Sequence, residues 1–259
     1  MLVQRFNILG VPVSAINMSQ AVEIIETWIE SRQTHYVCVT GVHGLMESQR
    51  DEELRRIHAR AGLVTPDGAP LLWLGRLHGF DHMDRVYGPD LMLRLCERSP
   101  AKGYRHYLYG GGKGVTERLQ VRLEERFPGV NIVGHHCPPF RPLTPREEDE
   151  VVRKINAARP DIVWVGLGTP KQESWMAAHR ARLNAPALIG VGAAFDFHAG
   201  VKRQAPRWMR LSGLEWLFRL ANEPRRLWRR YLVNNTCFVV LVLAQACGLK
   251  RYPETASAR

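Results

Sequence analysis

Short runs of apolar residues, rich in Val, Ile and aromatic side chains, alternate with longer amphipathic stretches over the first three quarters of the chain. Runs of this length are typical of buried strands. We expect strands at residues 35–40, 62–66, 105–110, 130–135, 161–168 and 187–192. The stretches 115–127 and 145–158 place apolar residues at helical spacing and acidic residues early, which predicts helices. This alternation indicates an α/β fold with a Rossmann-like, doubly wound and mainly parallel sheet.

The alternation stops near residue 195, and two arginine-rich, helix-like segments follow, separated near Glu223-Pro224. We therefore expect an α/β domain of residues 1–195 and a C-terminal appendage of residues 196–259. Arginines of the appendage interleave with aromatic residues, and the run from Cys237 to Ala244 is wholly apolar. Guanidinium groups bind phosphate, and aromatic rings settle at the level of lipid headgroups. The appendage is predicted to lie on an anionic membrane surface without spanning it, because a spanning helix needs roughly 20 apolar residues.

Charge narrows the kind of partner. The 259 residues, 45% of them hydrophobic, carry a formal net charge of +11, which favours nucleic acid, anionic lipid or a phosphorylated substrate. A basic nucleic-acid-binding α/β protein is therefore the alternative function, although nucleic acid offers no surface that matches the apolar run. A nicotinamide-dependent oxidoreductase is disfavoured, since no GxGxxG motif follows the first strand. The N-terminal residues lack the apolar segment of a secretory signal and read as a strand and turn, so we expect a protein inside the cell.

Neither a disulfide framework nor a metal site is predicted. The five cysteines are odd in number, widely spaced and without a CxxC pair. His135, His136 and Cys137 are adjacent, but neighbouring residues on a strand point to opposite faces. We expect no metal and no cofactor.

Polar residues follow two of the predicted strands, where ligands bind in open α/β sheets. Asp67 follows the strand at 62–66 on a turn whose Gly68 permits close backbone approach. It is a candidate general base, or it caps the helix that follows. His43 comes after the strand end at Thr40 and is expected on the same rim, as a ligand contact or as a structural histidine.

Two glycine-rich turns are candidate binding sites. The first turn consists of Gly110, Gly111 and Gly112 and comes just before a predicted helix, where free backbone amides can bind a phosphate group. The alternative is a flexible turn without a binding role, which would have the same sequence pattern. The second turn suits a sugar or nucleotide, with an ordinary helix start as the alternative. It consists of Gly168, Thr169, Pro170, Lys171, Gln172 and Glu173.

The ordered motifs of the chain resemble one known family. They read VTGVHGLMESQRD, TPDG, RVYGPDL, YLYGGG, GLGTPKQE, GVGAAFDFHAG and GLEWLFRLANEPRRLWRRY. Together they are similar to the WecG/TagA/CpsF glycosyltransferases over about residues 6–232. The resemblance implies transfer of a hexose-type sugar from a UDP donor to a polyprenyl-diphosphate-linked saccharide. It also implies inversion at the anomeric carbon, no metal ion, a peripheral place on the cytoplasmic face of the plasma membrane, and a role in making cell-surface polysaccharides such as teichoic acid or exopolysaccharide.

The resemblance also implies residue roles. Asp67 would deprotonate the acceptor hydroxyl, with Thr40, Arg85 and Gln172 near the sugar and diphosphate. The UDP-sugar would contact His43, Glu173 and the two glycine turns, Gly110 to Gly112 and Gly168 to Lys171. The lipid-linked diphosphate would be held by Arg219, Arg226 and Arg229. Val42 stands where many members have Asn, so N-acetylmannosamine, glucose and related hexoses stay open as donor sugars, and so does a homo-oligomer.

Overall fold

A parallel sheet of six strands forms the centre of the molecule, in the order β4-β3-β8-β7-β5-β6. The computed structural model describes residues 3–253, apart from the side chains of Leu211, Arg226 and Arg230. Its strands are β3 (His35–Thr40), β4 (Leu63–Pro66), β5 (Arg105–Gly110), β6 (Asn131–His136), β7 (Ile162–Gly166) and β8 (Ala187–Gly190). The predicted α/β fold with a doubly wound parallel sheet is confirmed. Strands β7 and β8 end two residues earlier than predicted, because Gly168 (φ 78°) and Gly192 (φ 51°) turn the chain out of the sheet.

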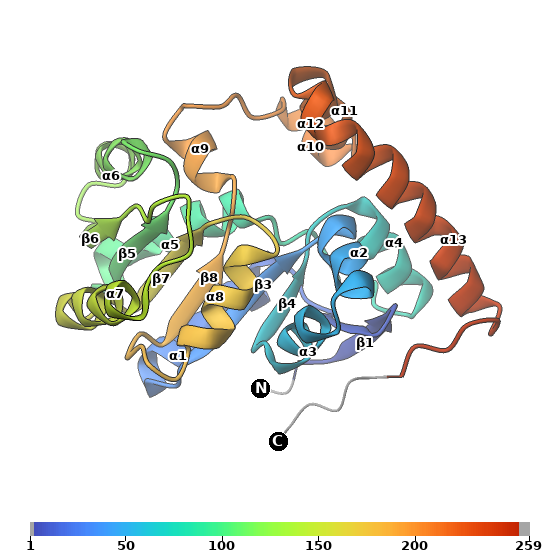
Figure 1. Ribbon diagram of the computed structural model, residues 1–259, viewed down its shortest axis with the longest axis horizontal. Helices are drawn as coiled ribbons and strands as arrows, with labels where there is room; N and C mark the ends of the chain where they lie inside the picture. The colour runs from blue at the N-terminus through green and yellow to red at the C-terminus, as the bar shows by residue number, and fades with distance from the viewer. Residues whose placement is uncertain (1–2, 254–259) are drawn as a thin grey trace.

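Helices cover both faces of this sheet (Figure 1). One apolar core contains residues of α1 (Met18–Ser31), α5 (Gly88–Lys102), α6 (Val115–Arg126) and α9 (Ala194–His198). The other contains residues of α2 (Val42–Arg50), α3 (Glu52–Arg60), α4 (Ala69–Leu77), α7 (Pro145–Ala158) and α8 (Lys171–His179). The predicted helices at 115–127 and 145–158 correspond to α6 and α7. A capping box between Thr144 and Glu147 fixes the start of α7.

The N-terminal strand and turn form a separate antiparallel hairpin, β1 (Arg5–Ile8) and β2 (Val11–Ser14). Leu9 (φ 53°) and Gly10 (φ 83°) at its turn both have positive φ, as a two-residue turn of type I′ requires. The hairpin is fastened to β4, since Val64 N donates to Ser14 Oγ at 3.1 Å.

Residues beyond α9 form more helices than the two predicted. They are α10 (Arg207–Leu211), α11 (Glu215–Asn222), α12 (Pro224–Trp228), a π-helical turn η1 (Arg229–Val233) and α13 (Asn234–Ala246). The predicted break at Glu223-Pro224 separates α11 from α12. In Figure 1 this segment crosses above the sheet, and α13 then runs beside α2 along the flank of the molecule.

Helix α13 packs on the hairpin. The side chain of Phe238 is buried in the core that contains β1 and β2. Gln245 accepts a hydrogen bond from Leu9 N at 2.9 Å and donates one to Asn7 O at 3.1 Å. The helix is therefore joined to the turn of the hairpin by both packing and directed bonds.

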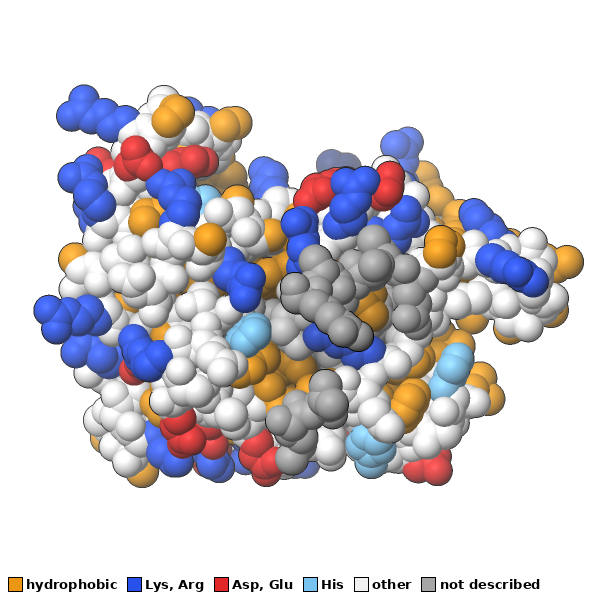
Figure 2. All heavy atoms as spheres, turned by 90° about the horizontal axis from the view of Figure 1, so that it is seen from below, with side chains coloured by type: hydrophobic (Ala, Val, Ile, Leu, Met, Phe, Trp, Pro, Cys, Tyr) orange, Lys and Arg blue, Asp and Glu red, His pale blue; other side chains and the backbone are white. Residues whose placement is uncertain are grey.

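Within residues 3–253, no helix has the length and apolar character that crossing a membrane requires. Lys and Arg side chains are spread widely over the face seen in Figure 2, with smaller groups of acidic side chains among them. The excess of positive side chains, which gives the net charge of +11, is therefore exposed over much of this face.

Candidate functional site

The winding of the sheet opens a crevice at the carboxyl ends of its strands. Strands β3 and β8 are hydrogen-bonded neighbours. The helix that follows β3, α2, packs in one core through Leu45, whereas the helix that follows β8, α9, packs in the other through Phe195. Neighbouring strands whose helices go to opposite faces leave room between them for a ligand.

A cleft of about 1530 Å³ occupies this crevice. Single small-molecule sites have volumes of roughly 300–1,000 Å³, so the cleft has room for two substrates together. Predicted site residues that line it are His43, Asp67, Arg85, Gly111, Gly112, Gly168, Thr169, Lys171, Gln172 and Arg219. The structure thus brings together side chains that lie up to 176 positions apart in the sequence.

The backbone at the ends of β3 and β4 fixes the place of Asp67. Its amide donates to Thr40 O at 2.9 Å. A Cβ at Gly41 would lie 2.5 Å from Asp67 O, so only glycine allows these two backbone segments to approach this closely. Two strand ends joined in this way hold Asp67 rigidly at the edge of the sheet.

The Asp67 carboxylate binds Arg85. Arg85 Nε and Nη2 each lie 2.8 Å from Asp67 Oδ1. The alternative that Asp67 caps α4 is wrong: Gly68 is the N-cap residue, and no side chain bonds to the free amides there. Arg85 is placed by the next residue, Val86, whose amide donates to Pro66 O at 2.9 Å.

Burial changes the acid–base properties of this pair. Removal from water raises the pKa of the Asp67 carboxyl, and Arg85 opposes this rise through its positive charge. Although burial alone would lower the pKa of Arg85, the neighbouring carboxylates of Asp67 and Glu215 raise it. Burial therefore favours the protonated form of Asp67, and Arg85 favours the ionised form.

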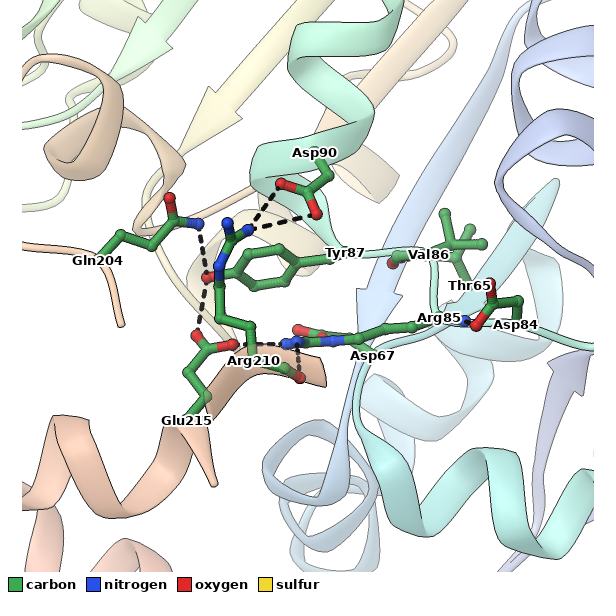
Figure 3. Close-up of polar contacts among 10 residues, drawn as sticks. All are labelled: Thr65, Asp67, Asp84, Arg85, Val86, Tyr87, Asp90, Gln204, Arg210 and Glu215. Carbon is green, nitrogen blue, oxygen red and sulfur yellow. Dashed lines mark hydrogen bonds and ion pairs between the residues drawn. The ribbon is translucent and has the colours of Figure 1, made fainter. Parts of the chain in front are cut away.

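Arg85 also binds Glu215 of α11 (Figure 3). Glu215 Oε2 lies 2.8 Å from Arg85 Nη2, and Glu215 Oε1 accepts a hydrogen bond from the Tyr87 hydroxyl at 2.7 Å. Sequence reasoning gave no role to Glu215 or Tyr87. The only signal was their presence in the motifs GLEWLFRL and RVYGPDL. The contact between Glu215 and Arg85 could not be predicted from spacing, because the two residues are 130 positions apart along the chain.

The first glycine turn lies against β7. A Cβ at Gly110 (φ 121°) would be 2.7 Å from the carbonyl carbon of Gly166, so this position needs glycine for contact as well as for conformation. Gly111 N donates to Gly166 O at 3.0 Å. Gly110 lies behind the wall of the cleft, while Gly111 and Gly112 form part of it.

The second turn places Gln172 at the wall of the cleft. Its Oε1 accepts from Gly168 N at 3.2 Å, and its Nε2 donates to Glu173 Oε1 at 3.0 Å. Thr169 Oγ1 donates to the same oxygen of Glu173 at 2.9 Å. Glu173 is buried behind the cleft, so it orients Thr169 and Gln172. Lys171 is exposed at the rim, one residue after the cis peptide bond between Thr169 and Pro170.

Thr40 and His43 occupy different surroundings. The buried Thr40 hydroxyl lies 3.0 Å from His58 Nε2 and 3.3 Å from Cys38 O, so it faces the interior. His43 is in the first turn of α2 and lines the cleft, where its Nδ1 lies 3.4 Å from Asn234 Nδ2 of α13. Asn234 in turn accepts from Arg50 at 2.8 Å. His43 therefore lies where α2, α13 and the cleft meet.

Comparison with known proteins identifies the family of this chain. The model of the "Glycosyl transferase WecG/TagA/CpsF family" matches residues 6–252. The chain belongs to this family. An N-acetylglucosaminyldiphosphoundecaprenol N-acetyl-beta-D-mannosaminyltransferase of Bacillus spizizenii is 28% identical over 206 residues, which cover 80% of this chain and 78% of that protein. A transferase of the same name from Staphylococcus aureus strain MW2 is 25% identical over 227 residues, or 87% of each chain.

The arginines after residue 195 in this glycosyltransferase are placed unequally. Arg219 of α11 lines the cleft, with its guanidinium carbon 5.9 Å from the centre of the Phe197 ring. Arg229 lies in η1 and packs on the Trp228 ring at 5.2 Å. The side chain of Arg226 lies outside the described residues. Arg219 is therefore the predicted tail arginine that the structure brings to the cleft.

No group of three or more His, Cys, Asp or Glu side chains among residues 3–253 is placed to hold a metal ion. His136 of the sequence His135-His136-Cys137 stacks on Tyr109, with ring centres 5.9 Å apart. The ring of His136 therefore has an aromatic neighbour, with the charges of Lys154 and Glu150 also close enough to act on it.

Proposed function

We propose that this glycosyltransferase moves a hexose-type sugar from a UDP donor to a polyprenyl-diphosphate-linked saccharide, with inversion at the anomeric carbon and without a metal ion. The observation that carries the proposal is Asp67, a carboxylate with a raised pKa, held rigidly in a cleft with room for both substrates. The relatives' names support a lipid-linked acceptor, because both contain diphosphoundecaprenol.

In the proposed reaction, Asp67 removes the proton of the acceptor hydroxyl. Arg85 binds Oδ1, which leaves Oδ2 to accept that proton. The acceptor oxygen then forms its bond to the anomeric carbon from the face opposite the diphosphate, and the bond between that carbon and the diphosphate breaks. UDP departs with the electron pair of the broken bond, and the proton remains on Asp67.

The departing diphosphate needs positive charge and hydrogen-bond donors. Lys171 and Arg219 line the cleft and would supply the charge. The backbone at Gly112 would supply a close donor, while Gly111 and Gly168, whose amides bond within the protein, would shape the wall beside Gln172. In this proposal the protein's own cations take the place that a divalent ion has in other transferases.

We further propose that residues 1–195 bind the donor and that residues 196–259 place the enzyme on the cytoplasmic face of the membrane, peripherally. The relatives' names make N-acetylmannosamine the first donor sugar to test. Val42 lies at the cleft, one residue before His43, in the place where many members have Asn. For that reason UDP-glucose and other UDP-hexoses belong in the same test.

The deciding experiment measures UDP release by the purified full chain with a polyprenyl-diphosphate-linked N-acetylglucosamine acceptor. Donors are UDP-N-acetylmannosamine, UDP-glucose, UDP-N-acetylglucosamine and UDP-glucuronate, each with and without EDTA. We expect acceptor-dependent release with one donor and no change with EDTA. Absence of UDP binding by calorimetry would refute the UDP donor, and loss of activity with EDTA would refute metal independence.

A further inference from the structure

The carboxylate of Glu215 is nearly removed from solvent, with 9% of its side chain exposed. Both of its oxygens have partners, since Oε2 is 2.8 Å from Arg85 Nη2 and Oε1 accepts from Tyr87 at 2.7 Å. A buried charge is costly unless it is paired and hydrogen-bonded. Glu215 is therefore built into the site by three elements: α11, the connection that carries Arg85, and the start of α5 next to Tyr87.

Arg85 is shared between two carboxylates at equal distance. It reaches Asp67 Oδ1 at 2.8 Å on one side and Glu215 Oε2 at 2.8 Å on the other. The ring of Tyr87 lies 4.1 Å from its guanidinium carbon, and its Nη1 donates to Arg210 O at 3.3 Å. Figure 3 shows the guanidinium enclosed by these groups. The three charged side chains of Asp67, Arg85 and Glu215 sum to one negative charge.

We propose that Glu215 is a positioning residue that holds Arg85 between two carboxylates, and so prevents Arg85 from neutralising Asp67 alone. The proposal rests on the proposed function, in which Asp67 is the general base. An arginine paired with a single carboxylate makes that carboxylate a weaker base. A second carboxylate on the same arginine offsets this effect and keeps Asp67 able to take a proton.

The charges around Asp67 act on its pKa in opposite directions. Burial raises its pKa, Arg85 lowers it, Glu215 raises it, and Arg219 of α11 lowers it. His43 of α2 and Asp84, next to Arg85, also line the cleft. Loss of the charge on Glu215 removes one influence that raises the pKa of Asp67 and leaves Arg85 to Asp67, so both effects weaken the base.

The test is a titration of Asp67 in the full chain by NMR, with aspartate labelled at the carboxyl carbon and Asp67→Asn used to assign the signal. Glu215→Gln keeps the shape and removes the charge. We expect it to lower the pKa of Asp67 by roughly one unit. Glu215→Asp keeps the charge and should hold the pKa near the wild-type value. Glu223→Gln is the control, because it makes the same charge change at the other end of α11, where Glu223 pairs with Lys202.

An unchanged or raised pKa of Asp67 in Glu215→Gln would overturn the proposal. A shift in Glu215→Asp as large as that in Glu215→Gln would overturn it too, since it would make the role of Glu215 one of shape. Where Glu215→Gln fails to fold, Glu215→Asp still decides between charge and shape. The titration needs no substrate, so it separates this proposal from the proposed function, which fails if the wild type transfers no sugar.

Activity provides a second measurement. In Glu215→Gln the acid limb of the pH profile of kcat/KM should move to lower pH, and the plateau should fall about tenfold as the base weakens. A lower plateau with an unmoved acid limb would contradict the proposal, because a general loss of structure lowers the rate without changing the pKa of the base.

Discussion

Asp67 was predictable from the sequence because its position relative to a strand is local information. A carboxylate one residue after an apolar run, followed by glycine, marks the carboxyl edge of a sheet whatever the rest of the chain does. The residues that surround it were harder to predict from the sequence. Arg85 came only from the family resemblance, and Glu215 had no signal beyond its place in the motif GLEWLFRL, since it reaches Arg85 only after α11 folds over the sheet.

Replacement of Asp67 by Asn tests the base directly. The amide has nearly the same shape but cannot take the proton of the acceptor, so turnover should fall by about 10²-fold or more. Binding of the UDP-sugar, measured by calorimetry, should remain. Turnover close to that of the wild type would show that another group is the base.

At the scale of single elements, sequence prediction succeeded where the hydrophobic period was regular. All six strands of the parallel sheet were predicted, as were α6 and α7. The N-terminal strand was also predicted, but its partner was not, because strand pairing depends on the fold and not on the period. Helices α10 to α13 were merged into two segments, since arginine and tryptophan at every few positions hide the breaks between them.

Glycine positions at the sheet edge give a matched pair of variants. Gly110 and Gly114 both have positive φ, at 121° and 76°. At Gly114 an added Cβ meets no atom within 4 Å, so Gly114→Ala should cost only the backbone strain, about 1 kcal/mol. At Gly110 the added Cβ would lie 2.7 Å from the Gly166 backbone, and Gly110→Ala should cost at least about twice as much. Urea unfolding of both variants checks this, and equal losses would contradict the contact seen between β5 and β7.

Strand β5 also carries a buried histidine that should make stability depend on pH. Trp164 Nε1 donates to His106 Nδ1 at 3.0 Å, and Ser99 Oγ lies 2.6 Å from His106 Nε2, so the neutral ring is satisfied. Burial lowers the pKa of His106 to about 3. In the unfolded chain the ring binds a proton below about pH 6.5, so the free energy of unfolding should decrease as pH falls, by about 1.4 kcal/mol per unit for this residue.

His106→Gln can replace both hydrogen bonds and removes the titrating group. Urea unfolding between pH 7 and pH 5 gives the free energy of unfolding as a function of pH. The slope of this dependence should be smaller than in the wild type, by the amount that corresponds to the binding of about one proton. An identical slope in the two proteins would mean that His106 is not neutral in the folded state.

At the scale of the whole molecule, α13 combines two surfaces. Phe238 faces the core, whereas Val239, Val240 and Leu243 are 54%, 59% and 59% exposed. Exposed apolar side chains on a helix that follows an arginine-rich segment agree with the proposed contact with a lipid surface. The apolar run led to the prediction of a membrane contact, but it did not indicate that the same helix packs on the first hairpin.

Vesicle binding tests this surface. Val240→Ser should weaken binding to vesicles that contain anionic lipid by about fivefold, since about 1 kcal/mol of apolar burial is lost. Val121→Ser is the matched control on α6, where Val121 is 52% exposed. Co-sedimentation measures both. Equal binding by the two variants would exclude α13 from the contact.

The bonds between α13 and the hairpin turn also set an order of events during synthesis. Leu9 and Gln245 are 236 residues apart in the chain. At 5–20 residues per second, the ribosome makes the second partner roughly 10–50 s after the first. During that interval the hairpin lacks the helix that completes its packing. Helix α11, which brings Glu215 to Arg85, also emerges late, so the newly made enzyme completes the ion pairs of its cleft and gains its apolar surface at nearly the same time.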